Sequence, residues 1–130
     1  MTLPERIFAL RSLPALASLD DIELAVIAEA ARERAYAPRA LVCPAGRVPA
    51  RLLFVCAGAV VDAEGRAQGC VPGASALLFN RPLAQAWTAS PEHGAQCLQL
   101  SRSHLFTMIR QCPTFLVGLM TDQPHSEPAP

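Results

Sequence analysis

Residues 36–58, YAPRALVCPAGRVPARLLFVCAG, contain the pattern that decides the fold. The segment 41–43 is a short apolar run that ends before Gly46, and 52–56 is a second apolar run that ends before Gly58. Short apolar runs bounded by glycine and proline are typical of β-strands joined by tight turns. The segment therefore predicts two consecutive strands of an antiparallel β-architecture.

Helical patterns precede these strands. Residues 4–17 predict a short helix followed by a turn. Asp20 and Glu23 have the spacing of a capping box, so a second helix is expected over 21–34. Its expected buried face, at helical spacing, consists of Ile22, Val26, Ile27 and Ala30.

Further short strands and two helices follow. Residues 59–61, 84–89 and 95–100 are the remaining strand candidates, and the polar stretch 62–69 leaves little room for strands in between. Ser101 can cap the next helix. Pro113 ends that helix and can itself open another, because proline suits the first helical position.

Composition indicates one globular domain. The chain has 130 residues, of which 52% are hydrophobic and 17% charged, and its formal net charge is zero. We expect the domain to span 1–121 and the proline-rich segment 122–130 to be a disordered tail. All eleven basic residues are arginines and they form no cluster, which argues against direct DNA binding. Abundant alanine and arginine without lysine suggest a bacterial source.

The sequence contains neither a membrane span nor a signal peptide. Its apolar runs are shorter than the roughly 20 residues that cross a bilayer, and charged residues interrupt the N-terminal segment. We therefore expect no membrane partner and a cytoplasmic location.

Cysteine and histidine spacing offers no catalytic set and no metal site. The five cysteines are dispersed, without a C-x-x-C motif, and the three histidines do not pair at ligand spacing. Most of the cysteines are expected to be buried structural thiols. A metal-dependent cupin-type enzyme and a Cys97–His93 nucleophile pair both lack supporting motifs. Trp87 is expected in the core. The sequence predicts a protein that is not an enzyme.

Short motifs recur in a fixed order along about residues 4–121. They are 13–16, 36–38, Gly46, 52–55, Gly58, 76–78, Arg81-Pro82, 98–102, 105–106 and Pro113. This ordered set resembles the cyclic-nucleotide-binding domain family, which includes catabolite activators, kinase regulatory subunits and gated channels. The resemblance implies a mainly β fold with flanking helices: an antiparallel β-roll, similar to a double-stranded jelly roll. One departure is Arg39, where the family usually has glycine after proline.

In this family a short helix, an arginine, a glutamate and a hydroxyl bind the cyclic phosphate and ribose. The corresponding segment here is 71–86, VPGASALLFNRPLAQA. It lacks the Gly-Glu pair, and Leu83 and Ala84 stand at the arginine and hydroxyl positions. Losing a hydrogen bond to a charged group weakens an interaction by about 1.5–3 kcal/mol. By resemblance, the candidate ligand-binding residues are Gly73, Ser75, Ala76, Leu77, Arg81, Pro82, Leu83 and Ala84.

Several hypotheses for function follow from this resemblance. The leading one is a non-catalytic regulatory or sensor module whose ligand contacts are largely lost, acting through a protein partner or a different small ligand. A second is a working sensor of cAMP or cGMP that uses Arg81 and backbone amides. A third is a small β-barrel enzyme, and a fourth is a truncated, inactive relic of a transcriptional regulator. No cofactor is expected beyond a cyclic nucleotide as ligand.

Overall fold

The computed structural model describes residues 1–121, so the predicted tail 122–130 lies outside the described residues. In chain order its elements are α1 (Leu3–Arg11), the 3-10 helix η1 (Pro14–Leu16), α2 (Asp21–Ala30), β1 (Arg32–Tyr36), β2 (Leu41–Cys43), β3 (Arg51–Gly58), β4 (Val60–Val61), α3 (Ala74–Leu78), β5 (Trp87–Ala89), β6 (Ala95–Ser101), α4 (Arg102–Gln111) and α5 (Pro113–Thr121).

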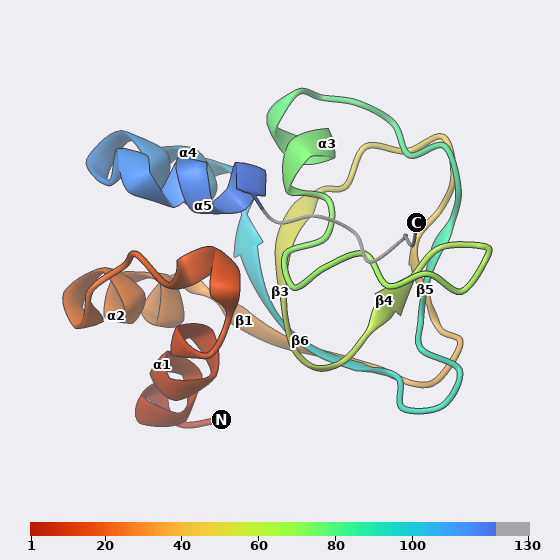
Figure 1. Cartoon of the computed structure of the whole chain (residues 1–130), viewed down its shortest axis with the longest axis horizontal. Helices are drawn as coiled ribbons and strands as arrows, with labels where there is room; N and C mark the ends of the chain where they lie inside the picture. Colours follow the sequence, from red (N-terminus) through yellow and green to blue (C-terminus); the bar gives the residue numbers. More distant parts are fainter. Residues whose placement is uncertain (122–130) are drawn as a thin grey trace, which may run out of the picture.

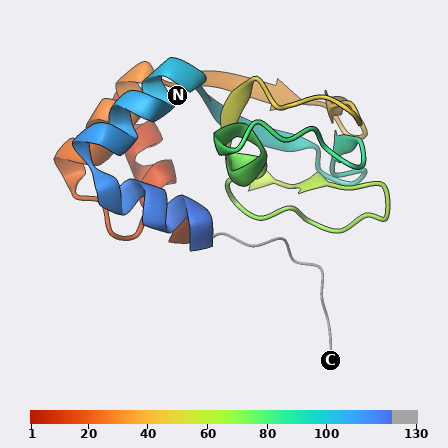
Figure 2. The same ribbon diagram turned by 90° about the horizontal axis from the view of Figure 1, so that it is seen from above.

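The strands form two antiparallel sheets, as the predicted β-roll requires. One sheet has the order β1-β6-β3 and the other the order β2-β5-β4. In the first sheet Phe54 lies opposite Leu98 and Val55 opposite Cys97. Helices α1, α2, α4 and α5 gather at one end of the molecule, and α3 lies beside β3 (Figures 1 and 2).

Strand β3 is buried on both faces. Leu52 and Phe54 belong to the larger hydrophobic core, which also contains the buried side chains of the helices. Leu53 and Val55 belong to a smaller core between the two sheets. Successive side chains of a strand point to opposite faces, so a strand with apolar surroundings on both sides has a continuous apolar sequence. This explains the uninterrupted run that 52–55 forms.

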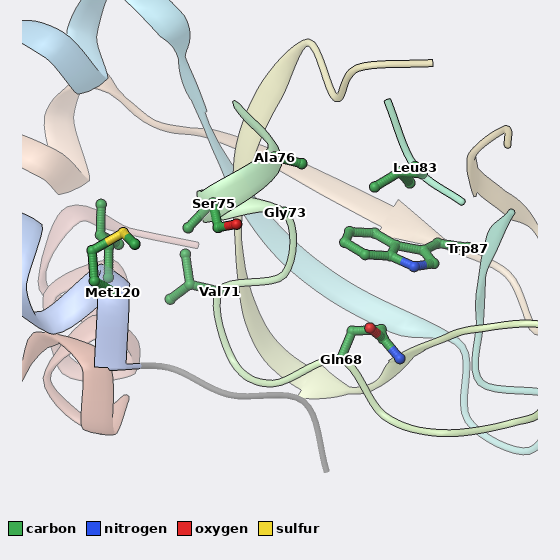
Figure 3. Close-up of a pocket in the computed structure, with 10 residues that line it drawn as sticks. Gln68, Val71, Gly73, Ser75, Ala76, Leu83, Trp87 and Met120 are labelled. Atoms are coloured by element: carbon green, nitrogen blue, oxygen red, sulfur yellow. The ribbon is translucent and has the colours of Figure 1, made fainter. Parts of the chain in front are cut away.

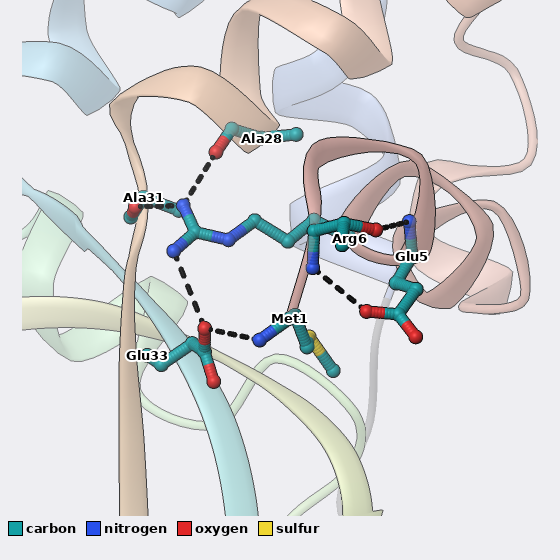
Figure 4. Close-up of polar contacts among 7 residues, drawn as sticks. Met1, Glu5, Arg6, Ala28, Ala31 and Glu33 are labelled. Carbon is teal, nitrogen blue, oxygen red and sulfur yellow. Dashed lines mark hydrogen bonds and ion pairs between the residues drawn. The ribbon is translucent and has the colours of Figure 1, made fainter.

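Arg6 ties α1 to the end of α2. Its Nη1 atom donates hydrogen bonds to the carbonyl oxygens of Ala28 and Ala31, at 3.0 and 2.8 Å, and its Nη2 atom lies 3.4 Å from a carboxylate oxygen of Glu33 (Figure 4). Carbonyls at the end of a helix have no partner within it, and a cation there is favoured by the helix dipole. Arg6, which belongs to α1, therefore supplies the hydrogen-bond donor for carbonyls at the end of α2.

The predicted helix over 21–34 is too long. The capping box of Asp20 and Glu23 is present as expected, but α2 ends at Ala30, and Ala31 has extended backbone angles. Arg32–Tyr36 forms strand β1, which pairs with β6 and is mostly exposed. The sequence prediction extended the helix into this strand because an exposed edge strand and the exposed face of a helix both consist of polar residues.

Two further details of the sequence prediction are wrong. On α2, Ile27 is buried as expected, whereas Ile22 and Val26 are 77% and 42% exposed. Leu24 and Ala28 are buried instead. The expected strand over 84–89 is shorter, since β5 begins only at Trp87. The helices predicted after Ser101 and Pro113 are confirmed by the caps and bounds of α4 and α5.

The predicted turn residues have the conformation that glycine favours. Gly46 and Gly58 have φ angles of 80° and 73°. A Cβ on Gly58 would lie 2.2 Å from the carbonyl oxygen of Gly94, so only glycine fits there. Arg39 also has a left-handed backbone, with φ of 68°. Its position is the one where the resembled family usually has glycine, and the backbone angle supplies the physical reason.

Replacing Arg39 with glycine should stabilise the fold. A non-glycine residue in the left-handed region carries a strain of roughly 1–2 kcal/mol, partly offset by the greater freedom of glycine in the unfolded chain. We expect Arg39→Gly to raise the free energy of unfolding by up to about 1 kcal/mol in urea denaturation. Arg47→Gly, at an exposed loop arginine outside the left-handed region, is the control and should bring no gain. A lower stability of Arg39→Gly than of the natural chain would contradict this explanation.

Helix α5 approaches η1 closely at Gly118. A Cβ built on Gly118 would lie 2.0 Å from the carbonyl oxygen of Ala15 and 3.1 Å from its carbonyl carbon. Both are backbone atoms, so a larger residue must move one of the two elements. Gly118 therefore sets the distance between α5 and the N-terminal helices.

Gly118→Ala should destabilise the protein even though alanine favours helices. Overpacking at a close contact is destabilising by typically 1–3 kcal/mol, which exceeds the gain of about 1 kcal/mol in helix propensity. Val117, on the same helix, is 63% exposed, so Val117→Ala is the matched control and should have little effect. Denaturation curves compare the two variants, and a Gly118→Ala variant as stable as the natural chain would show that the contact is not limiting.

Candidate functional site

The segment between β4 and β5 forms a loop, the short helix α3 and a second loop. Gly73 precedes α3 with φ of 81°. A Cβ on Gly73 would lie 3.2 Å from the ring of Trp87 and 3.3 Å from Pro49. A side chain here would thus press on both neighbours, and glycine lets the chain pass them. Leu77 and Ala74 are buried in the larger core and hold α3 in place.

Backbone hydrogen bonds fix the chain after α3. The amide of Leu83 donates to the carbonyl of Arg47 at 3.0 Å, and the amide of Gly46 donates to the carbonyl of Leu83 at 2.8 Å. This reciprocal pair joins the second loop to the turn after β2. Leu83 is consequently buried and faces inward (Figure 3).

A pocket of about 300 Å³ lies beside α3. We call it the Trp87 pocket. Figure 3 shows Trp87 and Leu83 on one side of α3 and Met120 of α5 on the other. Among residues 1–121 the lining is mostly apolar, and its polar side chains are those of Gln68 and Ser75. The described lining residues are Gln68, Val71, Gly73, Ala74, Ser75, Ala76, Leu83, Trp87, Leu119 and Met120.

Trp87 also borders a second, smaller pocket of about 120 Å³. This pocket is lined by residues of both sheets, including Tyr36, Leu53 and Gln99. The indole therefore lies at the boundary between the two spaces. The sequence predicted Trp87 as a core residue, and it does pack against the smaller core. It is only half-buried, however, and it lines both pockets.

Four of the predicted site residues meet in the Trp87 pocket: Gly73, Ser75, Ala76 and Leu83. The other four lie elsewhere. Leu77 is fully buried in the larger core, and Arg81, Pro82 and Ala84 are exposed and do not line the pocket.

Arg81 lies on the surface next to an aromatic ring. Its guanidinium carbon is 5.5 Å from the centroid of the Phe79 ring, within the range of a cation–π contact. Phe79 is itself exposed. In this structure Arg81 therefore has a surface partner outside the pocket.

Sequence reasoning missed the residues that reach the pocket from other segments. Gln68 and Val71 come from the loop before α3, and Leu119 and Met120 come from α5. The signal that could have found the last two was the apolar α5 itself, which contacts α3 in the fold. Their convergence depends on the tertiary structure rather than on local sequence spacing.

Three of the five thiols, those of Cys43, Cys56 and Cys97, lie in surroundings that keep them protonated. Burial, followed by the influence of nearby Cys56, raises the pKa of Cys97 to about 12. Burial also raises the pKa of Cys43 and of Cys56. These thiols stay protonated near neutral pH and are poor nucleophiles. Within residues 1–121 no group of three or more His, Cys, Asp or Glu side chains could hold a metal ion.

His104 lies at the start of α4, outside the pocket lining. The Nδ1 atom of His104 lies 2.7 Å from the hydroxyl of Ser101, at the cap of α4 and away from the pocket lining.

In the described part of the chain, no helix combines the length and the apolar character needed to cross a membrane.

Comparison with solved structures identifies the fold. The regulatory domain of Toxoplasma gondii PKA with cAMP matches with a TM-score of 0.65 and 21% identity, covering 86% of this chain and 46% of that one. The catabolite activator protein of Thermus thermophilus matches with a TM-score of 0.63 and 20% identity over 82% and 55% of the two chains.

A third match is the regulatory subunit of a cAMP-independent protein kinase A from Trypanosoma brucei. Its TM-score is 0.73 with 21% identity, covering 88% of this chain and 43% of that one. The present chain thus spans about half the length of these proteins. No protein-family profile and no curated protein matches the sequence. The two antiparallel sheets, the flanking helices and these structural matches show that the chain has the cyclic-nucleotide-binding domain fold.

Proposed function

We propose that this chain is a non-catalytic regulatory module that uses the cyclic-nucleotide-binding fold without binding a cyclic nucleotide. The observation that carries this proposal is the lining of the Trp87 pocket. The segment that resembles the phosphate-binding segment of the family contributes Gly73, Ser75, Ala76 and Leu83, and within residues 1–121 none of the lining side chains is charged.

A cyclic nucleotide is an anion, and a buried anion needs a charged or hydrogen-bonding partner. Without one, the loss of hydration opposes binding by several kcal/mol. Leu83 occupies the position that the resemblance assigns to an arginine, and its side chain is buried and apolar. The guanidinium of Arg81 lies at Phe79 on the surface. The part of the chain that the structure describes therefore offers the phosphate no cation inside the pocket.

The fold is compatible with regulation that does not depend on cAMP. One structural match is described as a regulatory subunit of a cAMP-independent kinase. For the present chain, regulation would act through contacts with a protein partner. Large apolar side chains on α1 and α2 support this: Phe8 and Ile22 are 70% and 77% exposed.

Thermal denaturation with and without nucleotide tests the proposal. A ligand that binds only the folded state at a hundred times its dissociation constant adds about 2.7 kcal/mol of stability. We expect no change in Tm with millimolar cAMP or cGMP. The regulatory domain of Toxoplasma gondii PKA, which has been crystallised with cAMP, is the positive control when it is freed of bound nucleotide and treated identically.

The variant Arg81→Ala tests the main alternative, which is a cAMP or cGMP sensor that uses Arg81. If the natural chain were a nucleotide sensor that uses Arg81, cAMP or cGMP would raise its Tm and this variant would lose the increase. A clear increase in the natural chain would overturn the proposed function. We expect that nucleotide changes the Tm of neither the natural chain nor the Arg81→Ala variant.

A further inference from the structure

The Trp87 pocket combines a flat aromatic wall with unused hydrogen-bonding groups. Among the described residues, the indole nitrogen of Trp87 has no hydrogen-bond partner. The Nε2 atom of Gln68 donates to the carbonyl of Arg66 at 2.9 Å, which leaves the side-chain oxygen of Gln68 without a partner in the described part of the chain. Figure 3 shows the nitrogen-bearing edge of the indole turned toward the side on which Gln68 lies. The pocket thus presents the indole N–H as a donor and the Gln68 oxygen as an acceptor, and the hydroxyl-bearing side chain of Ser75 also lines it.

The remaining wall is apolar and adaptable. Met120 lies across from Trp87, on the other side of α3 (Figure 3). Methionine is flexible and its sulfur makes favourable contacts with aromatic rings. The indole face itself prefers offset or edge contacts with another aromatic ring. The indole wall therefore favours a flat ring system over an aliphatic chain.

Charge and size narrow the class of ligand further. None of the described residues that line the pocket is charged, and the nearest charged residues along the preceding loop, Glu64 and Arg66, pair with each other. An ion would lose its hydration without gaining a counterion. A volume of about 300 Å³ is at the small end of the range for ligand pockets.

We propose that the Trp87 pocket binds a small, uncharged aromatic molecule, which stacks on the indole and exchanges hydrogen bonds with the indole nitrogen and the Gln68 carbonyl. This ligand class rests on the proposed function, because the absence of charge that argues against a cyclic nucleotide is also what selects a neutral molecule.

The chain supplies its own reporter for this proposal. Trp87 is its single tryptophan, so all tryptophan emission comes from the pocket. N-phenyl-1-naphthylamine is an uncharged aromatic probe that accepts energy from indole, and 1-anilinonaphthalene-8-sulfonate has the same ring systems with an added sulfonate. We expect the neutral probe to quench Trp87 emission saturably at one probe per chain. The sulfonate should bind at least about tenfold more weakly, a difference of about 1.4 kcal/mol.

Matched substitutions show whether the probe occupies the pocket. Ala76 lines the pocket, whereas Ala84 is exposed in the same segment and does not. Ala76→Leu should fill the space and weaken binding of the neutral probe at least about tenfold, and Ala84→Leu should leave it unchanged. The comparison of the two probes on the natural chain does not depend on either variant folding.

The outcomes distinguish a failure of the ligand class from a failure of the proposed function. Absent or unsaturable quenching, equal binding of the two probes, or equal effects of the two substitutions would overturn the ligand class. If the neutral probe fails and cAMP also leaves the Tm unchanged, only the ligand class is wrong. Displacement of the neutral probe by cAMP or cGMP, together with a raised Tm, would overturn the proposed function as well.

Discussion

The two-sided burial of strand β3 is the constraint on which the rest of the structure depends. Its side chains alternate between the helical core, through Leu52 and Phe54, and the space between the sheets, through Leu53 and Val55. The sheet β1-β6-β3 is therefore a shared wall, and neither core can form without it. The same wall fixes where the helices can pack and where the second sheet must lie. The Trp87 pocket lies where these parts meet, next to α3 and the end of α5.

The residues that shape the Trp87 pocket differ from those that would determine what it binds. Gly73 allows the chain to pass Trp87 and Pro49, and Leu77 anchors α3 in the larger core. These are packing requirements, and they hold whichever ligand is bound. The chemistry depends on a few side chains that point into the space, and here these are apolar or neutral. On the proposed function, architecture and ligand preference diverge within one segment of sixteen residues, 71–86.

Much of the fold could be predicted from sequence, because local signals such as the Asp20–Glu23 capping box, Gly46, Gly58 and Pro113 act over a few residues. The errors share a cause. The end of α2 depends on Arg6, and the exposure of Ile22 depends on which face of α2 meets other helices. Of the pocket lining, the sequence predicted four residues in the segment around α3: Gly73, Ser75, Ala76 and Leu83. It could not place Leu119 and Met120 beside them, since that requires the packing of α5 against α3.

The order of strands in the main sheet has a consequence for how the chain folds during synthesis. Strand β6 is the last strand in the sequence but the central one in its sheet, between β1 and β3. Until β6 leaves the ribosome, β1 and β3 have no partner in that sheet, and the apolar side chains of β3 cannot be buried between the two cores. Contacts between distant parts of a chain slow folding, and unpaired apolar strands are prone to aggregate. The nascent chain is thus most vulnerable just before residues 95–101 emerge.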